Sequence, residues 1–263
     1  MLWSLLGRNA ACVFGLMTIL WIVSVVRRDA SLVDPWWSIA FLLVASDTAL
    51  TTGLTPAKGL LLALVALWAL RLWFHLLKRS LGKPEDPRYT AFRERFGRKR
   101  YWWVSFFQVF LLQGALVLLI SAPLQIACAA AAPDRLRPLH LVASLVFGIG
   151  FGFEVVADHQ LQAFRDDPAR RQGVLDTGLW RYSRHPNYFG EALLGFGLWL
   201  FAVPFPYGWL SLLAPLLMTF LLLKVSGVAL LDAHLSARKP AYQAYIDHTS
   251  AFLPLPPRAA RSG

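Results

Sequence analysis

The chain has 263 residues, of which 57% are hydrophobic and 16% are charged, with a formal net charge of +11. A soluble domain of this length needs more polar surface to cover its core. The apolar residues form runs close to the ~20 residues that span a bilayer. Composition therefore excludes a soluble globular protein and predicts an all-α integral membrane protein. The positive charge calls for no nucleic-acid partner, because loop topology and attraction to anionic lipid account for most of it.

Seven apolar segments predict about seven transmembrane helices. In chain order they cover about 10–26, 36–52, 58–77, 104–122, 139–158, 187–204 and 208–231. Lys and Arg gather in the connections 27–35, 78–103 and 159–186 and after residue 231. Because basic loops stay in the cytoplasm, we expect the C-terminus inside and the N-terminus outside. Arg27 and Arg28 follow the first apolar segment and no cleavage site is evident, which favours a retained helix over a signal peptide.

Two short patterns have structural readings. GIGFG at 148–152 is rejected as a dinucleotide-binding motif because it lies within an apolar span with no strand before it. It fits close helix packing through Gly148 and Gly152 better. Cys12 and Cys128 have no Cys or His neighbour at ligand spacing, so we expect buried thiols and no metal site.

Ionisable and polar side chains recur at helical spacing inside three predicted spans. Each such residue costs ~2–3 kcal/mol to insert and usually faces a cavity or a partner. The three sets are Arg71, His75 and Lys78; Glu154, Asp158 and Arg165; and Asn187 and Glu191. Lys78 can equally reach the headgroups, and the carboxylates can form structural ion pairs. Together the three faces predict a polar chamber that opens to the cytoplasm.

The stretch GLWRYSRHPNYFGE, residues 178–191, precedes the sixth predicted span. Pro186 suits the first turn of a helix, which places His185 near the N-cap. A helix N-terminus with Arg181 and Arg184 beside it is suited to a phosphate-bearing ligand. A basic flank with a helix cap is the alternative, but it leaves Asn187 and Glu191 unexplained.

These residues carry a resemblance to the membrane steroid 5α-reductase family, whose bacterial branch has long been catalogued as a domain of unknown function. GLWRYSRHPNYFGE resembles the family signature, and SLVDPWW at 31–37 and VSGVALLDAHLSARKPAYQAYIDHTSAFLPLPP at 225–257 agree with it. The resemblance covers about residues 31–257. A shorter RHPxYxG core is shared with membrane methyltransferases, so that piece alone is weak.

The resemblance implies a single seven-helix reductase domain over 1–263 that binds NADPH in a cytoplasm-facing cavity. It implies a lipid-substrate half at roughly 10–122 and a cofactor half at roughly 139–257. Arg71, Asp158, Arg165, Tyr182, Asn187, Glu191 and Tyr245 match cofactor-binding positions, and we add His75 and His185 from the polar chamber. The expected substrate-binding residues are Asp34, Trp37 and Trp68.

The catalytic pair of the family, a glutamate and a tyrosine that hold the ketone oxygen, carries over less well. Trp68 stands where the tyrosine is expected and has no hydroxyl. Asp34 is the acidic residue nearest the glutamate position, so we assign it the catalytic role. The alternative is that Asp34 is only the N-cap of the second span, before Pro35.

The sequence thus predicts an NADPH-dependent reductase of a C=C bond conjugated to a ketone in a steroid-like lipid. The substrate is expected to enter from the bilayer into a monomeric protein. Residue usage rich in alanine and arginine favours a bacterial inner membrane. The alternatives are a membrane methyltransferase that uses S-adenosylmethionine on a lipid thiol or amine, and a sterol-binding receptor without turnover.

Overall fold

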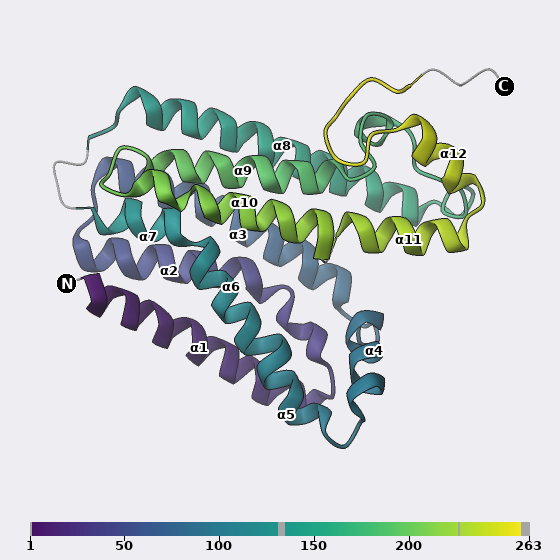
Figure 1. Cartoon of the computed structure of the whole chain (residues 1–263), viewed down its shortest axis with the longest axis horizontal. Helices are drawn as coiled ribbons and strands as arrows, with labels where there is room; N and C mark the ends of the chain where they lie inside the picture. Colours follow the sequence, from purple (N-terminus) through teal and green to yellow (C-terminus); the bar gives the residue numbers. More distant parts are fainter. Residues whose placement is uncertain (1, 131–134, 226, 259–263) are drawn as a thin grey trace. The chain divides into compact units, whose positions relative to one another are not determined.

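The computed structural model describes residues 2–130, 135–225 and 227–258 (Figure 1). In these ranges helices are the only regular secondary structure, which confirms the all-α prediction. The chain forms two compact units, each with its own packing. Unit 1 comprises Met1–Arg137 with Phe201–Trp209, and unit 2 comprises Pro138–Leu200 with Leu210–Gly263.

Unit 1 is built around the central helix α2, which packs against α1, α3 and α7. A short 3₁₀ turn, η1, precedes α2, and a π-helical segment, η2, joins α5 to α6. The elements are α1 (Leu2–Arg27), η1 (Ala30–Val33), α2 (Trp36–Thr52), α3 (Pro56–Ser80), α4 (Pro87–Phe96), α5 (Tyr101–Ser105), η2 (Phe106–Leu111), α6 (Leu112–Ile120) and α7 (Ala122–Ala129).

Unit 2 places the long helix α8 beside α9, and the C-terminal helices follow α10. Its elements are α8 (Pro138–Asp166), η3 (Gly178–Arg181), α9 (Pro186–Ala202), η4 (Gly208–Leu212), α10 (Leu213–Phe220), η5 (Leu221–Val225), α11 (Val228–Arg238) and α12 (Ala241–His248). The end of α9 and the start of η4 belong to unit 1. The helix α9 begins at Pro186, as its sequence predicts.

Five of the described helical segments are long and apolar enough to cross a membrane, which supports an integral membrane protein. They are Trp3–Arg27, Pro56–Ser80, Tyr101–Ile120, Pro138–Asp166 and Gly208–Val225. The other two predicted spans fall on α2 and α9, which have 17 residues each. At 1.5 Å per residue such a helix is about 26 Å long, slightly less than the ~30 Å hydrocarbon core. Length and composition therefore support five of the seven predicted spans.

Buried polar side chains link the helices of unit 1. The carboxamide of Asn9 on α1 donates to Thr48 Oγ1 on α2 at 2.9 Å and to Gln125 Oε1 on α7 at 3.3 Å. Lys58, which is only 2% exposed, donates through Nζ to Thr52 Oγ1 at 2.8 Å. An unsatisfied polar group in an apolar interior is costly, so these bonds fix which helix faces meet.

Glycines bring α8 and α9 into close contact, but not those that the sequence analysis selected. A Cβ on Gly148 or Gly152 would meet nothing within 4 Å, so these two do not form the packing face. A Cβ on Gly150 would lie 2.4 Å from Leu194 N, and one on Gly190 would lie 2.5 Å from Gly150 O. The GIGFG motif therefore does pack a helix closely, through its central glycine.

Replacing Gly190 by Ala should lower the melting temperature of the purified protein. The added methyl group meets backbone atoms of α8, and overpacking of this kind costs about 2 kcal/mol, which corresponds to a decrease of about 5 °C. Gly148→Ala is the matched control, because its methyl group has open space. Equal melting temperatures for the two variants would contradict the close α8–α9 contact.

Candidate functional site

Asp34 lies between η1 and α2 and forms the centre of a polar cluster in unit 1. Its Oδ1 accepts a hydrogen bond from the Tyr89 hydroxyl at 2.5 Å, and its Oδ2 accepts one from the Arg88 guanidinium at 2.8 Å. Pro35 occupies the N-cap position of α2, and no side chain caps that helix. The interpretation of Asp34 as the N-cap is therefore wrong, and its carboxylate is directed to α4 instead.

The connection after α3 folds back to deliver the partners of Asp34. Asp86 caps the start of α4, and its Oδ1 accepts from Arg88 N and Nε, both at 2.9 Å. Glu85 accepts from the backbone N–H of Ala30 at 2.8 Å, which ties this connection to η1. Gln113 on α6 donates to the Tyr89 hydroxyl oxygen at 3.3 Å. Tyr89 thus lies between an acid and an amide donor.

The electrostatics of this cluster favour retention of a proton. Burial raises the pKa of Asp34, and this effect outweighs the lowering by the Arg88 charge and the Tyr89 hydrogen bond. Burial, followed by the charge of Asp34, raises the pKa of Tyr89 well above its ordinary value of 10.0. The carboxyl and the phenol therefore both release their protons less readily than they would in water.

Aromatic side chains lead from Asp34 into unit 1. Trp37, one turn after Asp34, contacts Phe41 with ring centroids 5.4 Å apart, and Phe41 contacts Trp68 at 5.6 Å. Trp68 is 3% exposed, and its Nε1 has no hydrogen-bond partner among the described residues. The structure thus brings the three predicted substrate residues into one region. Arg71 and His75 are half-buried on α3, one and two turns beyond Trp68.

In unit 2 the predicted polar residues of α8 meet the first turn of α9. The Asn187 carboxamide donates to Asp158 Oδ1 at 3.0 Å, and both Glu154 and Asp158 are buried. Glu191 is half-buried one turn after Asn187, while Arg165 and Tyr182 are exposed. The Asp158–Asn187 bond shows that two of the polar faces predicted from helical spacing meet each other.

The remaining motif residues bind the C-terminal segment of the chain. Asp232 on α11 accepts from Arg184 at 2.7 Å and pairs with His185 Nε2 at 3.0 Å, and the Tyr242 hydroxyl donates to it at 2.7 Å. Burial alone would raise the pKa of Asp232, but hydrogen bonds from His185, Arg184 and Tyr242 hold it well below its ordinary value. The Tyr245 hydroxyl donates to the carbonyl oxygen of Trp180.

Backbone and hydroxyl contacts complete this attachment. Arg184 N donates to Ser250 O at 2.8 Å, and Ser183 Oγ donates to Phe252 O at 2.8 Å. Ser183 Oγ also accepts from His185 N at 3.1 Å. Arg184, His185 and Tyr245 are therefore occupied within the protein, and the start of α9 offers less to a phosphate than the sequence indicated.

Sequence reasoning missed Arg88, Tyr89, Asp232 and Tyr242. A signal existed for Asp232, an acidic residue at the end of an apolar run within a family-like stretch. No sequence signal pointed to Tyr89, because it lies 55 residues from Asp34 in the chain and meets it only in the folded structure. Among the described residues, no three His, Cys, Asp or Glu side chains come close enough together to hold a metal ion.

The chain belongs to the family described as a protein of unknown function, DUF1295, whose model matches residues 20–249. It is 26% identical over 274 residues to an uncharacterized protein of Schizosaccharomyces pombe, an alignment that covers 92% of this chain and 77% of the relative. No solved structure is significantly similar to this chain.

Replacing Asp232 by Asn should loosen the C-terminal segment. The change removes the charge that Arg184 and His185 share, and loss of such charge-assisted hydrogen bonds costs about 2 kcal/mol, or about 5 °C in melting temperature. Because the folded pKa of Asp232 is lowered, its contribution is present above the unfolded pKa and is lost only as pH falls through the folded value. The deficit should therefore be full at pH 7.

The matched control is Asp247→Asn, since Asp247 is exposed on α12 and, within the described part of the chain, its side chain accepts only from Gln243. Limited proteolysis should cut Asp232→Asn after α11 faster than wild type or this control. Wild-type protection in Asp232→Asn would show that Asp232 does not hold the segment.

Proposed function

We propose that this member of the DUF1295 family is a membrane-bound, NADPH-dependent reductase that reduces a C=C bond conjugated to a ketone in a steroid-like lipid. The observation that carries the proposal is the hydrogen bond from the buried Tyr89 hydroxyl to the half-buried Asp34, beside the aromatic residues Trp37, Phe41 and Trp68. Reduction of a 3-oxo-Δ4 steroid to its 5α product is the model reaction.

The chemistry of the reaction requires a proton donor at the ketone. As the β-carbon of the enone accepts a hydride, negative charge develops on the ketone oxygen, and a fixed donor there stabilises the enolate by several kcal/mol. The enolate then takes a proton at its α-carbon. When Asp34 is protonated, its hydroxyl can donate to the Tyr89 oxygen, which frees the phenol hydrogen for the ketone. Tyr89 would thereby supply the hydroxyl that Trp68 lacks.

The described residues fit a nicotinamide dinucleotide. NADPH supplies the hydride when bound. Asp158, Glu191 and Asn187 carry the carboxylate and carboxamide groups that can exchange their bonds for hydroxyl and amide groups of a ligand, and Arg165 is exposed and carries the charge that suits a phosphate. We also propose that NADPH contacts Tyr182, Arg71 and His75. His185 and Tyr245 act as positioning residues in this proposal, because their polar atoms already hold the motif against the C-terminal segment.

The hydrogen-bonded pair of Asp34 and Tyr89 also favours the reductase over the methyltransferase alternative. Methyl transfer to a thiol or amine removes a proton from the acceptor, so the reaction needs a base. Burial raises the pKa of Asp34, so this carboxyl keeps its proton to higher pH than a free one does, which suits a proton donor. A sterol receptor needs neither a base nor a proton donor. The cluster of Arg88, Tyr89 and Gln113 around Asp34 would then serve no chemical purpose.

The proposed topology has seven spans, with α2 and α9 as the shorter ones. The N-terminus lies outside, and the connections 78–103 and 159–186 face the cytoplasm with the cofactor residues. This orientation rests on the distribution of Lys and Arg. A monomer in a bacterial inner membrane, with the lipid entering sideways from the bilayer, completes the proposal.

Asp34→Asn and Tyr89→Phe should each slow reduction of a 3-oxo-Δ4 steroid by 10²–10⁴-fold, roughly the contribution of a positioned acid. NADPH affinity should stay unchanged. Because the protonated carboxyl is the active form and burial raises its pKa, wild-type kcat should be constant below that pKa and fall as pH rises through it. Steady-state kinetics across a pH series measure both effects.

Asp47→Asn is the control for this pair of variants, because Asp47 lies on α2 and pairs only with Arg8 among the described residues. It should keep wild-type kinetics. Full activity in Asp34→Asn or Tyr89→Phe would remove the proposed proton donor.

Arg165→Ala and Glu191→Ala should each weaken NADPH binding about tenfold, the effect of losing one charge-assisted hydrogen bond. Arg98→Ala removes an exposed arginine of unit 1 and should leave the affinity unchanged. Titration of the dinucleotide fluorescence gives the dissociation constants. Thermal stabilisation by S-adenosylmethionine, with none by NADPH, would reverse the choice between reductase and methyltransferase.

A further inference from the structure

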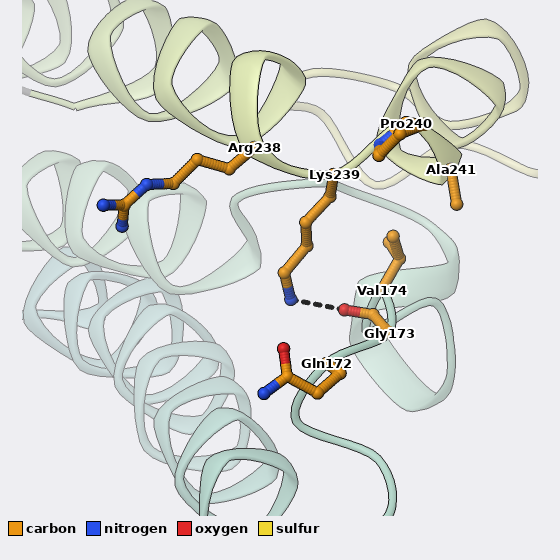
Figure 2. A pocket seen from close by; sticks show the side chains of 7 residues that line it. All are labelled: Gln172, Gly173, Val174, Arg238, Lys239, Pro240 and Ala241. Carbon is orange, nitrogen blue, oxygen red and sulfur yellow. Dashed lines mark hydrogen bonds between the residues drawn. The ribbon is translucent and has the colours of Figure 1, made fainter.

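A surface pocket of about 470 Å³ lies in unit 2, between the end of α11 and the loop that follows α8. It is lined by Gln172, Gly173, Val174, Arg238, Lys239, Pro240 and Ala241. Figure 2 shows Lys239 extending from the α11–α12 junction toward the loop, with Arg238 and Gln172 at the margins. The volume lies within the range of small-molecule sites.

The pocket carries positive charge without a matching carboxylate. The Lys239 ammonium donates to the carbonyl oxygens of Gly173 and Arg171, and these neutral groups leave its charge uncompensated. Arg238 is exposed, and the structure gives it no ion pair with any of the described residues. No acidic residue lines the pocket.

Lys239 shares an aromatic neighbour with a further cation. Arg170 lies over the Phe164 ring at 6.0 Å, and Lys239 lies over the same ring at 5.7 Å. The first turn of α12, which begins at Ala241, adds the positive end of a helix, and no side chain caps it.

We propose that this pocket binds a phosphate monoester group, contributed by either a nucleotide or an anionic lipid headgroup. Arg238 would donate two parallel N–H hydrogen bonds to the phosphate oxygens. Lys239 would add a compact positive charge, and Gln172 would add a neutral donor. None of Asp158, Asn187 and Glu191 lines the pocket, and phosphate binding there does not require the proposed reduction.

The test uses the full chain in phosphatidylcholine nanodiscs, with Arg238→Ala, Arg238→Lys and the control Arg98→Ala. One arm compares the dissociation constants of NADPH and NADH, which differ only in the 2′-phosphate. The other arm measures the rise in melting temperature when phosphatidic acid is added to the nanodiscs. Without ligand, the three variants should melt like wild type, because the substituted side chains have no ion pair among the described residues.

In one of the two arms, we expect Arg238→Ala to weaken binding of the phosphate-bearing ligand about tenfold. Arg238→Lys should restore part of this binding, and Arg98→Ala should bind like wild type. Loss of the NADPH preference identifies a nucleotide phosphate, and loss of the phosphatidic acid effect identifies a lipid headgroup. The lipid arm does not depend on reductase activity. If both preferences are equal in wild type and Arg238→Ala, the pocket is no phosphate site.

Discussion

In this chain a polar group among apolar helices must find its partner within the protein, because hydrocarbon offers none. Asn9 meets Thr48 and Gln125 between α1, α2 and α7, and Asp158 meets Asn187 between α8 and α9. These bonds decide which faces of the helices pack together.

The two units provide hydrogen-bond partners for their polar groups in different ways. In unit 1 the connections on either side of α2 and α3 fold together, so that Asp34 and Tyr89 share a hydrogen bond at the edge of an aromatic region. In unit 2 the motif after η3 uses Arg184 and His185 to hold Asp232 and the C-terminal segment. The residues of a motif that resembles a ligand site in sequence thus have different structural roles. Arg184 and His185 hold the C-terminal segment, while Asn187 joins α9 to Asp158 on α8.

Helical periodicity was sufficient to predict the local features. It predicted the start of α9 at Pro186, because a helix start depends on neighbours in sequence, but it did not pair Asp158 with Asn187, 29 residues away. It could not predict that Tyr89 would meet Asp34, since contacts between distant connections leave no periodic trace. It placed the close contact of GIGFG on the wrong glycines, because spacing alone does not say which face of α8 meets α9.

The most direct test of the proposed reduction is a deuterium transfer from NADPH labelled at the reactive position of C4 to a panel of 3-oxo-Δ4 steroids, with the products identified by mass. We expect a saturated ketone that carries one deuterium at the β-carbon and one solvent hydrogen at the α-carbon, formed by wild-type protein and nearly absent with Asp34→Asn. An unlabelled steroid and unchanged NADPH with every member of the panel would contradict it.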